Sequence, residues 1–166
     1  MSESLPLKRI SLEGIPQALE KAERYRVLND PEQAESICLD ILETDPQNQK
    51  AGVVLILALT DQFSRAGGGD LVRRARELLP KLTEEYARLY FAGIIHEREA
   101  RAFLGRGASR AFAYDGFWTA LEWYAKAQRI HPPGNDDAVL RWNSCVRTIE
   151  REGLSSRAPE NELPLE

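Results

Sequence analysis

The sequence predicts an all-α fold of about seven helices joined by short connections. Apolar residues recur at three- and four-residue intervals along most of the chain, and the strict two-residue alternation of β-strands is absent. Turn-forming residues interrupt this pattern at residues 29–31 (Asn-Asp-Pro), 45–46 (Asp-Pro), 67–70 (Gly-Gly-Gly-Asp) and 132–135 (Pro-Pro-Gly-Asn). With 166 residues, 43% of them hydrophobic, the chain can form one domain or a short array of small repeats.

The first four helices follow from proline and capping signals. Pro16 suits the first turn of a helix. Asp30 is expected to cap the second helix, which has Pro31 in its first turn and ends before Pro46. The third ends at the glycine run, and Asp70 is expected to cap the fourth. The predicted helices lie at residues 16–28, 31–45, 49–65, 71–82, 83–104, 116–131 and 136–151.

The last three helices are separated by less regular segments. Glycines at 105–107 are expected to end the fifth helix, and residues 108–115 form an irregular insertion. The sixth helix ends at Pro132, and Asn135 or Asp136 caps the seventh. Residues 1–14 and 152–166 lack an apolar stripe, and we interpret them as tails.

Charge and cysteine content restrict the possible functions. The net charge of −4 disfavours nucleic acid as a partner, although residues 63–110 carry ten basic and six acidic side chains. The sequence contains no run of eighteen apolar residues, so it predicts no membrane span. Cys38 and Cys145 lie far apart without ligand-like neighbours, and the N-terminus lacks the features of a signal peptide. We therefore expect a cytoplasmic protein with free thiols.

The sequence also lacks the patterns of an enzyme. His96-Glu97 resembles the start of a zinc-protease motif, but Ala100 stands where the second histidine is needed. The glycine runs lack the residues of phosphate-binding loops, and His131 is expected to cap a helix end. We expect no catalytic, cofactor-binding or metal-binding residues and no cofactor.

Six aromatic residues are concentrated around the sixth helix. Trp123 and Tyr124 are expected in the core. For Phe112, Tyr114 and Trp118 two interpretations stay open, packing within the insertion or an exposed contact patch.

Helix pairs recur at a spacing of about 34 residues. Ala22, Tyr25, Ala34 and Pro46 occupy set places in the first pair, and the segment ALEWYAKAQRIHP, which ends at Pro132, repeats its second half. Small residues such as Ala22 and Ala34 let paired helices approach closely, while Tyr25 and Tyr124 are expected to fill the space to the next pair.

This pattern resembles tetratricopeptide (TPR) repeats over residues 15–151. The pairs would span 15–48, 49–82 and 83–134, followed by a capping helix. The middle pair departs from the pattern, since Pro80 falls two places early. The resemblance implies a right-handed α-α superhelix.

The resemblance also implies a partner-binding groove along the first helices of the pairs. Leu19 and Glu23 stand where some members carry a clamp for a terminal carboxylate, so that clamp is not expected. We expect Leu57 and Phe91 to anchor apolar side chains. Arg26 and Arg88 are expected as partners for carboxylates, with Arg88 pairing with an acidic group of the bound segment. The expected groove residues are Leu19, Glu23, Arg26, Lys50, Val53, Leu57, Asp61, Ala87, Arg88, Phe91, Val139 and Asn143.

The resulting expectation is a non-enzymatic interaction module, an adaptor or assembly factor, that binds a peptide or helix of another protein. The alternative is a self-associating protein or structural subunit that uses its convex or end surfaces, so a homo-oligomer is possible. No nucleic acid or membrane partner is expected. The acidic residues 159–166 offer a further interpretation, in which the chain's own end covers its basic middle.

Overall fold

The computed structural model describes residues 4–65, 68–107 and 110–156. These residues form no strands, and the expected all-α class is confirmed. The elements are α1 (Ile15–Val27), α2 (Pro31–Thr44), α3 (Gln49–Thr60), α4 (Gly68–Leu78), the 3-10 turn η1 (Leu79–Lys81), α5 (Glu85–Gly105), α6 (Arg110–Arg129) and α7 (Asp137–Glu152).

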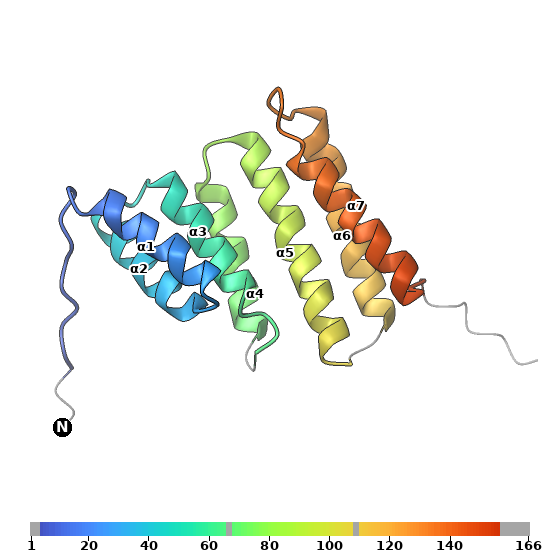
Figure 1. Ribbon diagram of the computed structural model, residues 1–166, viewed down its shortest axis with the longest axis horizontal. Helices are drawn as coiled ribbons and strands as arrows, with labels where there is room; N and C mark the ends of the chain where they lie inside the picture. Colours follow the sequence, from blue (N-terminus) through green and yellow to red (C-terminus); the bar gives the residue numbers. More distant parts are fainter. Residues whose placement is uncertain (1–3, 66–67, 108–109, 157–166) are drawn as a thin grey trace, which may run out of the picture.

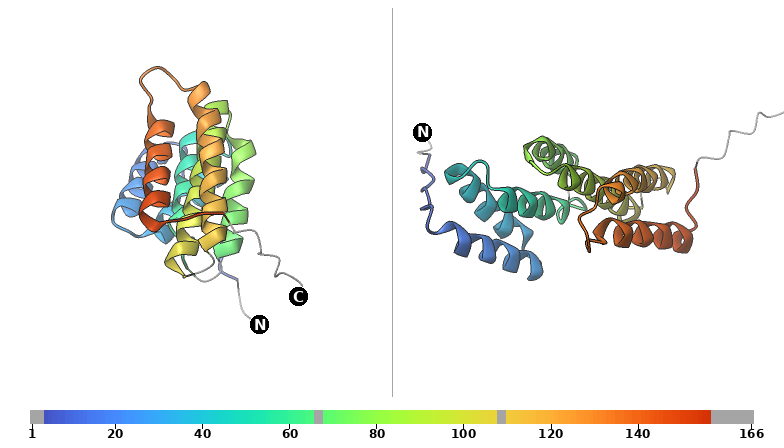
Figure 2. Two further views of the ribbon diagram at one scale, coloured as in Figure 1. Left: turned by 90° about the vertical axis from the view of Figure 1, so that its right-hand side faces the viewer. Right: turned by 90° about the horizontal axis from the view of Figure 1, so that it is seen from above.

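The helices are stacked side by side in chain order, from α1 at one end to α7 at the other (Figure 1). Each helix packs against the next, and α3 also contacts α1 and α5. Seen from above, α1 and α7 lie at opposite ends of the same side, and α3 and α5 lie between them (Figure 2). This arrangement is a helical array.

Two hydrophobic clusters form most of the core, and α5 contributes to both. The first involves α1 to α5 and contains Ala22 and Ala34, both fully buried as expected. The second joins α5, α6 and α7 around Phe117 and Tyr124. Half-buried Phe91 of α5 packs against both clusters. Because close-packed interiors tolerate little extra volume, the buried alanines let paired helices approach.

Several helix ends follow the predicted capping chemistry. The Asp30 side chain accepts a hydrogen bond from the Gln33 amide at the start of α2, which ends at Thr44 before the proline. The Asn135 side chain accepts from the Asp137 amide at 3.0 Å at the start of α7. The 3-10 turn η1 includes Pro80, which has no amide hydrogen to extend an α-helix.

The connection between α3 and α4 differs from the prediction. The third helix ends at Thr60 rather than at residue 65, and Asp70 is not a cap, because α4 already begins at Gly68. A Cβ at Gly68 would lie 2.4 Å from the Phe63 carbonyl oxygen. This glycine therefore permits a close backbone approach inside the first helical turn, where we had expected a turn that ends the preceding helix. Gly67 lies outside the described residues.

Most of the predicted insertion is helical. The sixth helix begins at Arg110 instead of residue 116, and Ala113 and Phe117 are buried on one side of it. Gly116 does not start the helix: a Cβ there would lie 3.0 Å from Ala100 Cβ, so the glycine brings α5 and α6 together.

The expected core places of the aromatic residues are only partly correct. Tyr124 is fully buried, but Tyr25 is 36% exposed. Trp123 is half-buried, with the Lys126 ammonium 4.6 Å from its ring centre. Phe112 and Trp118 are exposed, and Tyr114 stacks on Trp118.

Parts of both expected tails contact the helices. Ile10 packs beside Ile15 and Ile41, and its carbonyl accepts a hydrogen bond from the Thr44 hydroxyl. At the other end, Leu154 is buried against the second cluster. The acidic residues 159–166, which we considered as a cover for the basic middle, lie outside the described residues.

Candidate functional site

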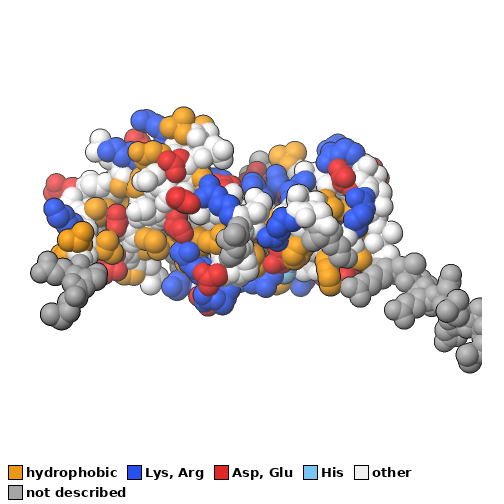
Figure 3. Space-filling model, turned by 90° about the horizontal axis from the view of Figure 1, so that it is seen from below, with side chains coloured by type: hydrophobic (Ala, Val, Ile, Leu, Met, Phe, Trp, Pro, Cys, Tyr) orange, Lys and Arg blue, Asp and Glu red, His pale blue; other side chains and the backbone are white. Residues whose placement is uncertain are grey.

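The side of the array bounded by α1 and α7 is hollowed. Seen from below, a depression separates two raised ends, and Lys and Arg side chains surround it (Figure 3). Three neighbouring cavities lie along α1, α3, α5 and α7, and we call this side the concave face.

The first cavity, the apolar groove, lies between the amino-terminal halves of α1 and α3 and the start of α5. Its volume is about 580 Å³. Half-buried Leu19, Val53 and Ala87 form part of its wall, while exposed Glu23 and Lys50 stand at its rim. These five residues were all expected in the groove, and the structure brings them together.

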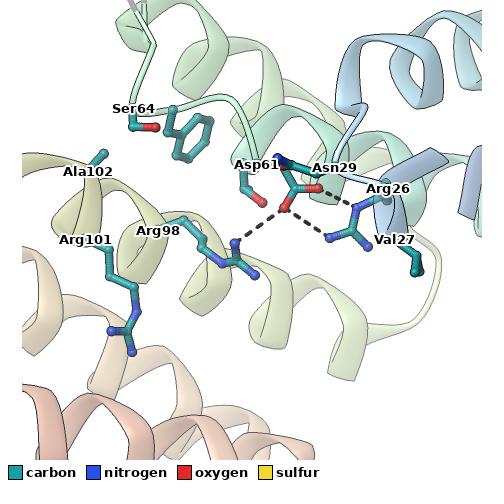
Figure 4. A pocket seen from close by; sticks show the side chains of 10 residues that line it. Arg26, Val27, Asn29, Asp61, Ser64, Arg98, Arg101 and Ala102 are labelled. Atoms are coloured by element: carbon teal, nitrogen blue, oxygen red, sulfur yellow. Dashed lines mark hydrogen bonds and ion pairs between the residues drawn. The ribbon is translucent and has the colours of Figure 1, made fainter. Parts of the chain in front are cut away.

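The second cavity, of about 470 Å³, lies at the carboxyl ends of α1 and α3. Asp61 stands on its wall between two arginines (Figure 4). The Arg26 Nε donates to Asp61 Oδ2 at 2.7 Å, and Arg98 Nη1 donates to Oδ1 at 3.4 Å. Arg26, which we expected to be a partner for an external carboxylate, therefore already binds one within the chain.

The remaining expected groove residues do not line these cavities. Leu57 lies one helical turn from both Val53 and Asp61, so it continues the stripe that joins the first two cavities. Phe91 is half-buried one turn beyond Ala87.

The three other expected groove residues lie outside this stripe. The Arg88 guanidinium donates to the carbonyls of Leu82 and Thr83, so this side chain stabilises the start of its own helix. Val139 and Asn143 are half-buried on α7, one turn apart.

A buried carboxylate that the sequence analysis missed lies behind the concave face. Glu97 of α5 is fully buried and accepts hydrogen bonds from Arg101 Nε at 2.8 Å, Tyr124 Oη at 2.9 Å and Cys145 Sγ at 3.3 Å. The Arg141 guanidinium binds both of its oxygens. We call this set the Glu97 network. It joins α5, α6 and α7.

The two arginines keep Glu97 ionised. Burial alone raises the pKa of this carboxyl, but the charges of Arg141 and Arg101 and their hydrogen bonds outweigh burial, so the pKa lies below its ordinary value. A glutamate beside Ile94 and Ile95 with an arginine four residues later was the available sequence signal, although it does not reveal Arg141, which comes from α7.

The third cavity, the arginine hollow, is bounded by α5 and α7 and measures about 380 Å³. Arg101 faces this side, pointing away from Asp61 toward the carboxy-terminal helices (Figure 4). It donates to the hydroxyls of Ser144 and Thr148. The arginines that line the hollow are Arg98, Arg101, Arg141, Arg147 and Arg151.

A fourth cavity, the aromatic groove, lies between α6 and α7 on the end of the array. Its volume is about 380 Å³, and Tyr114, Trp118, Leu121 and Trp142 contribute to its wall. Trp118 is 53% exposed and Trp142 is 36% exposed. The open question about the aromatic residues is thus answered for Trp118, which belongs to an exposed apolar surface.

Metal ligands, histidines and membrane-spanning helices were the other features considered in the sequence, and the described residues bear on each of them. They contain no group of three or more His, Cys, Asp or Glu side chains arranged to hold a metal ion. His96 is half-buried, and burial and then Arg76 lower its pKa, so it is neutral near pH 7. His131 Nδ1 lies 2.5 Å from the Gln128 carbonyl at the end of α6, consistent with the expected capping role. None of the described helices combines the length and apolar character needed to cross a membrane.

Comparisons with protein-family models, curated proteins and solved structures found no match to this chain.

Proposed function

We propose that the protein is an interaction module, built from helix pairs similar to TPR repeats, that binds a segment of another protein along its concave face. The apolar groove carries this proposal, since five of the residues expected from the repeat pattern gather around one open cavity. An extended or helical peptide presents side chains at intervals that such a groove accepts.

The groove combines apolar surface with charged side chains at its rim. Leu19, Val53 and Ala87 offer apolar surface that a bound side chain would cover, while Glu23 and Lys50 offer charges of both signs at the rim. Leu57 and Phe91 extend the apolar surface along the face, and we retain them as anchors. Arg88 is a weaker candidate for a carboxylate partner, because its Nη1 already donates to the carbonyls of Leu82 and Thr83.

Capture from a lysate of cells that express the chain tests this proposal. The full chain and the variant Val53→Glu/Ala87→Glu are immobilised, and retained proteins are identified by mass spectrometry. Leu39→Glu is the matched control, since Leu39 is 46% exposed on α2 and lines none of these cavities. A specific protein should be retained by wild type and control and lost by the groove variant, whose helicity is verified by circular dichroism. Equal retention by all three would contradict the proposal.

A second candidate function is self-association through the aromatic groove. The exposed faces of Trp118 and Trp142 around a largely apolar cavity favour it, because monomers seldom expose such a patch without a function. Light scattering should then give a mass that rises with concentration and a constant monomer mass for Trp118→Ser. A constant monomer mass for the wild type would exclude self-association.

A further inference from the structure

The arginine hollow contains more positive charge than its own carboxylates balance. Arg101 and Arg141 share Glu97, which lies buried beneath them. Arg151 has Glu152 at 3.4 Å. The five arginines of the hollow therefore meet only three carboxylates within the described residues, and the third, Asp61, is shared with Arg26.

Arg147 and Arg98 both line the hollow and have donors that no described residue accepts. The Arg147 side chain is exposed and lines the cavity, and it makes no hydrogen bond or ion pair with any residue that the structure describes. Arg98 reaches Asp61 at 3.4 Å through Nη1, but its Nε is buried without a hydrogen-bond partner. The other guanidinium nitrogen of Arg98, Nη2, has no partner among the described residues either, so it can donate to an anion in the hollow.

These arginines lie on the same face as the apolar groove, so one extended ligand can contact both. Arg98 lines both the arginine hollow and the second cavity, whose wall includes Arg26 and Asp61 at the ends of α1 and α3. The three cavities lie one after another along the concave face, with the apolar groove at one end and the arginine hollow at the other.

We propose that the arginine hollow binds a glutamate- or aspartate-rich segment of the partner protein, an inference that rests on the proposed function. Guanidinium groups bind carboxylates through paired N–H donors, so Arg98 and Arg147 are suited to this ligand. Nucleic acid fits less well, because Glu20, Glu23 and Glu84 stand at the other end of the same face and would repel a long phosphate chain.

Fluorescence anisotropy with a labelled oligoglutamate peptide tests the proposal on the full chain. The peptide should bind and be released by added salt, whereas an oligoglutamine peptide of equal length should not bind. Arg147→Glu should weaken binding about tenfold, since it removes one ion pair and adds a repulsion. Arg129→Glu is the matched control, because it makes the same charge change on α6 at an exposed arginine outside the cavity.

Four results would overturn the proposal. These are absence of peptide binding, equal weakening by Arg147→Glu and Arg129→Glu, tighter Arg147-dependent binding of a single-stranded oligouridylate, and peptide binding only by a chain that ends at Ser156. The last would assign the hollow to the chain's own carboxy-terminal residues.

Lysate capture separates this proposal from the preceding one. A protein lost by Val53→Glu/Ala87→Glu but retained by Arg147→Glu would leave the interaction module standing and remove the acidic-segment site. Peptide binding that depends on Arg147, without any protein captured by the wild type, would leave the acidic-segment site standing and remove the interaction module.

Discussion

Replacing Glu97 by glutamine would remove the charge at the centre of the Glu97 network while keeping its volume. Loss of one member of a buried ion pair typically costs about 3–5 kcal/mol. Here the side chains of Arg101 and Arg141 are 31% and 29% exposed, so water in the arginine hollow can partly solvate them. The amide also retains an acceptor for Tyr124. We therefore expect Glu97→Gln to lower the free energy of unfolding by about 2–3 kcal/mol at pH 7.

Urea unfolding followed by circular dichroism measures this difference, and pH gives a second test. The pKa of Glu97 is lowered in the folded state, from an ordinary value of 4.5. Its contribution is therefore present above pH 4.5 and lost as the pH falls through the folded-state pKa. The difference between wild type and Glu97→Gln should shrink on acidification below pH 4.5.

Glu99→Gln is the matched control. Glu99 lies two residues away on the same helix and pairs with Arg76 at 3.2 Å near the surface, where an ion pair contributes about 1 kcal/mol or less. A loss for Glu97→Gln no larger than that of the control, or one that does not change with pH, would refute the reasoning.

Three further predictions concern packing and thiol chemistry. Gly93→Ala should destabilise the fold by about 1–2 kcal/mol in urea unfolding, despite its better helix propensity, because the new Cβ would lie 2.5 Å from the Tyr124 ring; a gain in stability would show that the ring can move. Ala120→Leu should cost about 1–3 kcal/mol at its fully buried site, and unchanged stability would disprove the tight α5–α6 packing. Burial raises the pKa of Cys38 to about 12 and also raises the pKa of Cys145, so both thiols should react with a disulfide reagent at pH 8 only after unfolding; rapid reaction of the native chain would contradict their burial.

Local signals in the sequence were sufficient to predict the helices and most of their ends. Asp30 and Pro46 act within one helical turn, so their effect does not depend on the rest of the fold. Glycine was the main source of error. Gly68 was interpreted as part of a turn and Gly116 as the start of a helix, but each lies within a helix. A Cβ added at Gly68 would lie 2.4 Å from the Phe63 carbonyl oxygen, and one added at Gly116 would lie 3.0 Å from Ala100 Cβ. A single sequence does not distinguish a glycine in a turn from one at a close contact, because the contact depends on how the chain folds back onto that residue.

The candidate site was predictable only in part, for a similar reason. The resemblance to TPR repeats placed Leu19, Val53 and Ala87 around one groove, as they are in the structure. It also placed Arg26 and Asp61 on this side, but it did not reveal that the two side chains pair across 35 residues. The pairing of Glu97 with Arg141 likewise depends on how α7 returns to α5, and it involves a separation of 44 residues.

The double role of α5 limits how this array can be divided. In a simple repeat protein each unit touches only its neighbours, so units can be removed or duplicated one at a time. Here α5 forms a wall of both hydrophobic clusters and also carries Glu97, whose partners come from α6 and α7. A cut before α5 would leave the amino-terminal half without part of its core. A cut after α5 would leave the charged Glu97 carboxylate in apolar surroundings without its partners from α6 and α7. The chain therefore behaves as one indivisible unit for protein engineering, and new repeats can be added only at its ends.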